Sequence, residues 1–177
     1  AGMEEIDAAM KAQGWPMGPF TLIDALGMDI CAEAGKVLWE GYGDRMRPAE
    51  LWMKLVELKR FGRKSGRGFY DYTSVSPTEP GRPDPALKEE IRKLQKAGTV
   101  PERGQSPGRF APERLMVLII NEAVLSLQEN ISSASEIEMA VLAGLGFPAA
   151  KGGLLHAADA VGIDTLVEGL DRMTQEL

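Results

Sequence analysis

The sequence predicts a mainly α-helical protein built from two related helical repeats packed on each other. Apolar residues recur at helical spacing along most of the 177-residue chain, and no stretch alternates like a strand followed by a hairpin turn. In addition, three motifs of the first half return in the same order in the second half. With 44% hydrophobic residues, the chain can bury a substantial core.

Four helices are predicted in the first half. The first covers Met3–Ala12 and the second Pro19–Leu26, after which Gly27 can adopt the left-handed conformation that ends a helix. Asp29 is expected to cap the third helix, because its carboxylate can accept hydrogen bonds from free N–H groups there. Apolar side chains that repeat on one face predict a fourth helix at about residues 48–60.

A proline-rich segment separates the two halves. Seven of the eleven prolines fall within residues 74–112, which are poor in large apolar side chains. Inside this segment, Pro85–Lys96 has apolar residues at helical spacing and a proline suited to a first turn, so it predicts a short helix. The predicted organisation is a first repeat at residues 1–73, a linker at 74–112 and a second repeat at 113–177.

The internal repeat pairs three motifs whose offset drifts only from 131 to 135 residues. The pairs are residues 5–10 with 136–141, residues 14–16 with 146–148, and residues 24–29 with 159–164. Glu113–Gln128 is apolar almost all round, so it is expected to be the most buried helix. It has no counterpart before Met3, and the first repeat is therefore expected to lack its first helix.

Composition and charge exclude several classes of function. The 20 Lys and Arg against 26 Asp and Glu give a net charge of −6 without a long basic run, which argues against nucleic acid or an anionic membrane as partner. One histidine and one cysteine cannot form a zinc site of the usual kind. The longest apolar run, residues 115–120, is too short to span a bilayer. The sequence therefore predicts a cytoplasmic protein without a metal.

Two motifs carry a family resemblance. Residues 14–29 read Gly-Trp-Pro-Met-Gly-Pro-Phe-Thr-Leu-Ile-Asp-Ala-Leu-Gly-Met-Asp, and residues 60–70 read Arg-Phe-Gly-Arg-Lys-Ser-Gly-Arg-Gly-Phe-Tyr. With them the chain resembles the C-terminal helical region of L-3-hydroxyacyl-CoA dehydrogenases, whose fold is like the C-terminal domain of 6-phosphogluconate dehydrogenase. The second copy, with residues 144–148 and 151–153, is similar to the second C-terminal repeat of multifunctional fatty acid oxidation enzymes, which also contain an enoyl-CoA hydratase.

The resemblance implies a parent enzyme whose chemistry lies outside this chain. In the family, an NAD-binding Rossmann domain precedes the helical region, which helps to close the acyl-CoA cleft and mediates dimerisation. The catalytic residues and the glycine-rich cofactor loop have no counterpart here, and no Gly-x-Gly-x-x-Gly occurs in the sequence. The resemblance thus implies NAD in the parent, no catalytic or cofactor-binding residue in this chain, and an inactive fragment.

One segment is a candidate wall of the substrate cleft. Its residues are Pro16, Met17, Gly18, Pro19 and Phe20. Two prolines and a glycine predict a tight turn into the second helix that leaves the N–H groups of Phe20 and Thr21 free. The matching family segment borders the substrate, so these N–H groups and the apolar side chains could also contact a ligand. Both interpretations stay open.

A basic turn is a candidate contact for a coenzyme A phosphate or for an acidic partner. Its residues are Arg60, Arg63, Lys64 and Arg67. The alternative is a solvated turn whose glycines adopt left-handed geometry. His156 could face Asp159 across a helical turn, but a structural role is the favoured interpretation, and Cys31 is interpreted as a small core residue.

Two further functions compete with the dehydrogenase hypothesis. The chain could be a non-catalytic helical assembly module that binds a partner through the face that a Rossmann domain would cover. A different dehydrogenase, of the 6-phosphogluconate type, is disfavoured by the motif at residues 60–70.

Overall fold

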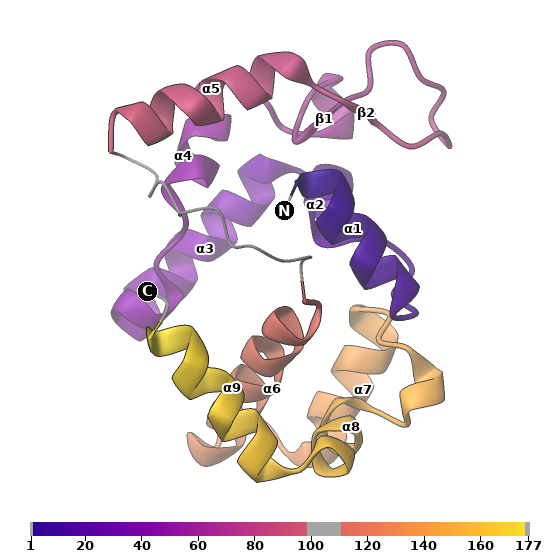
Figure 1. The fold of residues 1–177 in the computed structure, drawn as a ribbon, viewed down its shortest axis with the longest axis vertical. Helices are drawn as coiled ribbons and strands as arrows, with labels where there is room; N and C mark the ends of the chain where they lie inside the picture. The colour runs from indigo at the N-terminus through magenta and orange to yellow at the C-terminus, as the bar shows by residue number, and fades with distance from the viewer. Residues whose placement is uncertain (1, 99–110, 176–177) are drawn as a thin grey trace. The chain divides into compact units, whose positions relative to one another are not determined.

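The computed structural model describes residues 2–98 and 111–175, and the predicted mainly α-helical class is confirmed (Figure 1). In these residues the only sheet is a two-residue antiparallel pair, β1 (Tyr70–Asp71) and β2 (Arg82–Pro83), with Tyr70 opposite Pro83. No helix in the described part of the chain is both long and apolar enough to cross a bilayer.

The described residues form two compact units. The N-terminal unit contains residues 2–7 and 19–98, and the C-terminal unit contains residues 8–18 and 111–175. The division falls within the first helix, so residues 8–18 group with the second repeat. The predicted boundaries at residues 73 and 112 stay a prediction.

Four of the described helices have the bounds that local sequence signals predict. The helices up to residue 98 are α1 (Met3–Ala12), α2 (Pro19–Leu26), α3 (Met28–Tyr42), the short 3-10 helix η1 (Gly43–Met46), α4 (Glu50–Glu57), the 3-10 helix η2 (Arg63–Ser65) and α5 (Pro85–Lys96). Those after residue 111 are α6 (Glu113–Gln128), α7 (Ala134–Gly144), the 3-10 helix η3 (Ala149–Lys151), α8 (Leu154–Val161) and α9 (Ile163–Gln175). The predictions for α1, α2, α5 and α6 are confirmed.

The expectation that Asp29 caps α3 is wrong. The helix begins one residue earlier, at Met28, and its N-cap is Gly27 with φ 107°. Asp29 lies in the first turn, where its carboxylate pairs with Nζ of Lys64 at 2.6 Å. An acid at this place still opposes the positive end of the helix dipole, but it does so beside a cation from another segment.

The core of the N-terminal unit includes a helix from the proline-rich segment. This core consists of Met28, Leu55, Phe69, Tyr70, Tyr72 and Leu87. Leu87 of α5 is 0% exposed. Asp84 caps α5 by accepting a hydrogen bond from the N–H of Ala86 at 2.8 Å, and Pro85 occupies the first turn. Burial of Leu87 anchors α5 in this unit.

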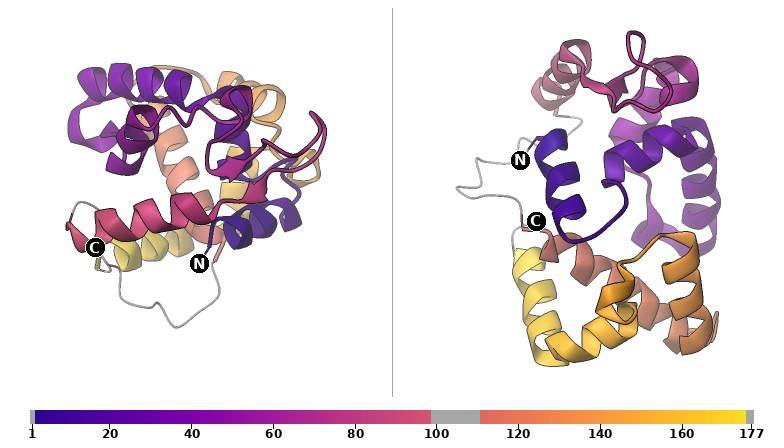
Figure 2. Two further views of the ribbon diagram at one scale, coloured as in Figure 1. Left: turned by 90° about the horizontal axis from the view of Figure 1, so that it is seen from above. Right: turned by 90° about the vertical axis from the view of Figure 1, so that its right-hand side faces the viewer.

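The core of the C-terminal unit lies among α6, α7 and α8. It consists of Ile120, Ala123, Ile137, Val141, Phe147, Leu154 and Ala158. Figures 1 and 2 show α6 beside α9, with which it packs. Most residues of α6 are buried or half-buried, although Leu118 and Val124 are each 48% exposed. That α6 is the most buried helix stays a prediction.

A buried carboxylate caps the second helix of the first repeat. Asp7 of α1 accepts hydrogen bonds from the N–H groups of Phe20 at 2.9 Å and Thr21 at 3.0 Å, in the first turn of α2. It also accepts from the hydroxyl groups of Thr21 and Tyr70. Pro19, the first residue of α2, has no N–H to satisfy. Free donors at a helix start need such partners.

The second repeat uses the same device. Glu138, the counterpart of Asp7, accepts from the N–H groups of Leu155 at 2.9 Å and His156 at 3.1 Å, the counterparts of Phe20 and Thr21. It also accepts from the N–H of Leu154 at 2.6 Å, which stands where the first repeat has a proline. The repeat is therefore present in hydrogen bonding as well as in sequence.

The matching loops at residues 14–16 and 146–148 contact each other within the C-terminal unit. The pairs are Gly14 with Pro148, Trp15 with Phe147, and Pro16 with Gly146. The two aromatic rings meet edge to face, with centroids 5.5 Å apart. A Cβ on Gly14 would lie 3.1 Å from Pro148, and a Cβ on Gly146 would lie 2.8 Å from Pro16. This reciprocal contact requires a glycine on both sides.

We expect loss of either capping carboxylate to destabilise the protein. Asp7→Ala leaves four donors without their acceptor and should lower the free energy of unfolding by about 2–3 kcal/mol, and Glu138→Ala by about 1–2 kcal/mol. Urea unfolding followed by circular dichroism measures both. Glu33→Ala, which removes an exposed acid of α3, is the control and should change stability by less than about 0.5 kcal/mol. Equal effects of Glu138→Ala and Glu33→Ala would contradict the capping role.

Candidate functional site

The predicted cleft segment, residues 16–20, leads into α2, whose first backbone N–H donors already have a hydrogen-bond acceptor. The N–H groups of Phe20 and Thr21 both donate to Asp7, so the expectation that they are free for a ligand is wrong. Sequence reasoning missed Asp7, although the acid at the same place in both repeats, Asp7 and Glu138, was a signal that could have identified it.

The side chains of this segment differ in how open they are. Met17 is 37% exposed and Gly18 is buried. Phe20 packs edge-on against Phe69, with ring centroids 4.8 Å apart, and so belongs to the core. Of the two large apolar side chains, Met17 offers the more open surface. The assignment of residues 16–20 to a substrate cleft stays a prediction.

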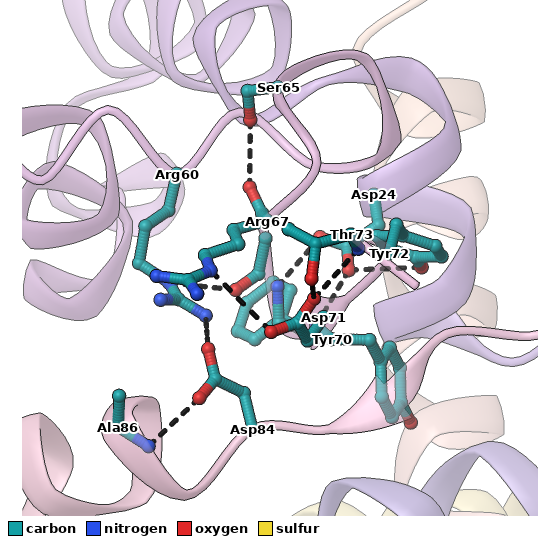
Figure 3. A network of polar contacts seen from close by, with 12 residues as sticks. Asp24, Arg60, Ser65, Arg67, Tyr70, Asp71, Tyr72, Thr73, Asp84 and Ala86 are labelled. Atoms are coloured by element: carbon teal, nitrogen blue, oxygen red, sulfur yellow. Dashed lines mark hydrogen bonds and ion pairs between the residues drawn. The ribbon is translucent and has the colours of Figure 1, made fainter. Parts of the chain in front are cut away.

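The second family motif folds onto a buried carboxylate of α2. Asp24 is 1% exposed and accepts hydrogen bonds from the N–H groups of Phe69 at 2.8 Å and Tyr70 at 2.9 Å, and from the Tyr72 hydroxyl at 3.1 Å (Figure 3). Burial raises the pKa of Asp24, while these donors oppose the shift. Burial also raises the pKa of Tyr72, which keeps its hydroxyl a donor.

Two glycines of the motif allow this close approach. A Cβ on Gly62 would overlap the backbone of Asp24, and a Cβ on Gly68 would overlap its carboxylate. Gly62 also has φ 92°, which L side chains rarely adopt. The glycines therefore serve contact with this chain's own aspartate. They do not form a cradle for a dinucleotide phosphate, and the described residues contain no parallel sheet that could carry one.

Arg60, the first residue of the basic turn, is an internal side chain. It is 7% exposed, donates from Nε to the Gly68 carbonyl at 2.9 Å, and pairs with Asp84 at 2.5 Å (Figure 3). Burial acts to raise the pKa of Asp84, but the hydrogen bonds from Arg60 and from the N–H of Ala86, together with the charge of Arg60, outweigh it, so the pKa lies below its usual value. Arg60 has no open face for a phosphate.

The other three basic side chains also have partners in the described residues. Arg63 lies over the Tyr72 ring, 4.4 Å from its centroid, and donates to backbone carbonyl groups of residues 76, 77 and 79. Lys64 pairs with Asp29, and Arg67 Nε lies 3.5 Å from the Asp71 carboxylate. The structure thus agrees with a turn that stabilises its own fold. A phosphate or partner contact of Arg63, Lys64 and Arg67 stays a prediction.

The single histidine and the single cysteine do not form a catalytic arrangement. Within the described residues, the exposed ring of His156 makes no hydrogen bond to a carboxylate, and no cluster of three or more metal-ligating side chains occurs. Burial raises the pKa of Cys31, so its thiol is not activated.

A shallow cavity of about 300 Å³ lies in the C-terminal unit among α6, α7 and α8. Its walls are mainly apolar, with Ile119, Ala123 and Val141 among them, and its polar members are Glu122, Ser126 and Ser132. The Ser126 hydroxyl donates to the backbone carbonyl of Glu122. No histidine, cysteine or lysine lines this cavity, and Glu122 is the titratable side chain among its described lining residues.

The sequence matches a family model over both predicted repeats. The matching model is described as 3-hydroxyacyl-CoA dehydrogenase, C-terminal domain, and it covers residues 1–72 and 110–177. The chain belongs to this family. The predicted resemblance is therefore confirmed, and the fold that carries the Asp24 and Asp7 contacts is that of a 3-hydroxyacyl-CoA dehydrogenase C-terminal domain.

Curated relatives are subunits of a larger enzyme. The chain is 37% identical over 170 residues to the fatty acid oxidation complex subunit alpha of Psychrobacter arcticus, a match that covers 93% of this chain and 23% of that protein. The corresponding subunit of Acinetobacter baumannii is 34% identical, with coverage of 97% and 24%. The chain thus spans about a quarter of the length of the relatives it matches.

Two solved structures share the fold. The 3-hydroxybutyryl-CoA dehydrogenase from Escherichia coli has a TM-score of 0.73 at 24% identity, over 99% of this chain and 52% of that one. The dehydrogenase part of multifunctional enzyme 1 from C. elegans has a TM-score of 0.52 at 22% identity, over 76% and 28%.

Substitution of Gly68 tests the contact with Asp24. Gly68→Ala places a methyl group on the Asp24 carboxylate and should lower the free energy of unfolding by about 2–4 kcal/mol. Gly41→Ala is the matched control: Gly41 lies in α3 with open space around its Cβ position, so alanine should raise stability by about 0.5–1 kcal/mol. Thermal and urea unfolding measure both. A tolerated Gly68→Ala would mean that this contact is not needed.

The pair of Arg60 and Asp84 should make stability depend on acid pH. Arg60→Met leaves a buried carboxylate unpaired and should cost about 3–5 kcal/mol at neutral pH. In the native chain the pKa of Asp84 is lowered, so its contribution is complete above about pH 4 and is lost as the pH falls through the lowered pKa. Urea unfolding from pH 7 down to about pH 3 should therefore show a smaller loss of stability in Arg60→Met than in the native chain. An equal loss would contradict the pairing.

Proposed function

We propose that this chain is the helical C-terminal region of an NAD-dependent 3-hydroxyacyl-CoA dehydrogenase that acts in fatty acid β-oxidation. The observation that carries the proposal is the family match over both repeats, together with relatives named as alpha subunits of fatty acid oxidation complexes. The parent would oxidise the 3-hydroxyl group of an acyl-CoA to a ketone. NAD would supply the hydride acceptor, bound by a Rossmann domain outside this chain, and an enoyl-CoA hydratase part can accompany it.

In this proposal, the chain lines the substrate cleft and contributes no catalytic residue. Met17, with its open side chain, and the turn at residues 16–20 would border the acyl-CoA. Asp7 is a positioning residue, because it fixes the first turn of α2 directly after this segment. The proposed parent is a cytoplasmic subunit of a larger assembly.

The isolated chain should have no dehydrogenase activity. It should not oxidise NADH in the presence of acetoacetyl-CoA above the rate of buffer, because the described residues contain no base paired with a carboxylate and no dinucleotide site. Absorbance at the NADH band measures this. Turnover by the purified chain would contradict this expectation if Met17→Lys abolishes it, because the activity would then belong to this chain and not to a contaminant.

Exposed apolar side chains favour a second role in assembly, including dimerisation. Val37, Met139 and Ile163 are 66%, 67% and 72% exposed, and association with a partner would bury such side chains. Under this alternative the chain is a non-catalytic helical interaction module. Light scattering tests self-association directly, because a monomer at all concentrations argues against a homodimer formed by this region alone.

A further inference from the structure

The contact between the tripeptides at residues 14–16 and 146–148 is the same from both sides. The glycine of each tripeptide lies against the proline of the other, and the two aromatic rings meet between them. The backbone agrees as well, because Gly14 has φ 96° and Gly146 has φ 68°. Every contact of one residue pair is thus repeated by the pair of their counterparts. Isologous interfaces, which use one patch on both sides, have this pattern.

A patch that pairs in this way is complementary to a copy of itself. We call residues 146–148 the tripeptide surface. If the tripeptide surface of a second copy took the place of residues 14–16, Gly146 of each copy would lie against Pro148 of the other, and the two Phe147 rings would meet. Glycine, aromatic ring and proline follow one another in the same order in both tripeptides, so the second copy supplies the same kinds of contact.

The tripeptide surface is apolar and is closed by the first repeat. Phe147 is 3% exposed, and the Trp15 ring packs edge to face on it. Loss of the Trp15 ring would open one face of Phe147 to water, and contact with a second copy would bury that face again. Residues 14–16 therefore compete with a second copy for one surface.

Two side chains distinguish the contact within one chain from the contact between two copies. Nζ of Lys151 donates a hydrogen bond to Oε1 of Gln13 at 3.1 Å. The counterpart of Gln13 before the second tripeptide is Leu145, which has no acceptor, so this bond favours the contact within one chain. The indole N–H of Trp15 is buried without a hydrogen-bond partner in the described part of the chain, whereas a Phe147 ring in its place has no donor to satisfy.

We propose that the tripeptide surface binds the tripeptide surface of a second copy, and that residues 13–16 block this binding in the intact chain. The blocking segment is tethered, so its effective concentration is on the order of 1 mM and it excludes a second copy at lower chain concentrations. The contact is thus an autoinhibitory one, and displacement of residues 13–16 would convert it into a homodimer contact. The proposal does not rest on the dehydrogenase role.

Cross-linking of the full 177-residue chain tests the proposal. In a Cys31→Ser background, Ala149→Cys places a single thiol at an exposed position directly after the tripeptide surface, and a short bismaleimide can then join two copies only. At about 100 μM chain, this parent should cross-link little, and Trp15→Ser should raise the cross-linked fraction about tenfold, because the tethered competitor is lost. Denaturing gel electrophoresis measures the fraction, and circular dichroism checks that the helices remain.

A milder variant opens the surface without touching the core. Gln13→Leu removes only the hydrogen bond to Lys151 and should raise the cross-linked fraction about fivefold. It decides the question alone if Trp15→Ser lowers the helix content. Trp39→Ser is the control for loss of a tryptophan, because Trp39 is 43% exposed on α3, and it should leave cross-linking at the level of the parent.

A matched pair of glycine variants separates the proposed contact from general adhesion of apolar surfaces. Each is added to the Gln13→Leu chain. Gly146→Ala should return cross-linking to the level of the parent, because a Cβ there meets the proline ring of the opposite tripeptide, as its 2.8 Å approach to Pro16 shows. Gly144→Ala should change nothing, because the space around its Cβ position is open.

Three outcomes would overturn the proposal. One is unchanged cross-linking in a folded Gln13→Leu chain, and another is an increase that Trp39→Ser produces as well. The third is an increase that Gly146→Ala leaves in place, which would mean that apolar surfaces associate without this geometry. These measurements use no enzymatic readout, so failure here leaves the proposed dehydrogenase role untouched, and NADH turnover by the isolated chain would leave the tripeptide surface untouched.

Discussion

The buried carboxylate of Asp24 is the constraint on which the N-terminal unit depends. Its carboxylate accepts hydrogen bonds from two backbone N–H groups and one phenol hydroxyl of residues 69–72. Gly62 and Gly68 allow the chain to approach the aspartate this closely, because a Cβ at either position would overlap it. An unpaired buried donor costs about 1–3 kcal/mol, so these groups hold the segment to the aspartate. From there the chain continues through β1 to its pairing with β2, and Arg60 secures Asp84 at the start of α5.

The two repeats keep the same capping device but use the following aspartate differently. Asp7 and Glu138 both cap the next helix. Asp24 is buried beneath the glycine-rich segment at residues 60–72, whereas its counterpart Asp159 is exposed among the described residues. In the first repeat, the retained aspartate makes a long-range contact.

The sequence predicted the helices because helix formation depends mainly on residues that lie close together along the chain. Apolar spacing and the terminal Pro85 and Gly27 are enough to place α5 and the end of α2. The contacts of Asp24 join residues 45 to 48 positions apart, and those of Arg63 end on backbone carbonyl groups, which leave no trace in side-chain patterns. In the same way, the 48% exposure of Leu118 and Val124 depends on the neighbours of α6 and not on its composition.

The grouping of residues 8–18 with the C-terminal unit affects the order in which the chain can fold during synthesis. The tripeptide at residues 14–16 leaves the ribosome long before Phe147 and Pro148, against which it packs. Contacts between residues so distant in sequence form slowly. These early residues can therefore become buried only after the second repeat has been translated.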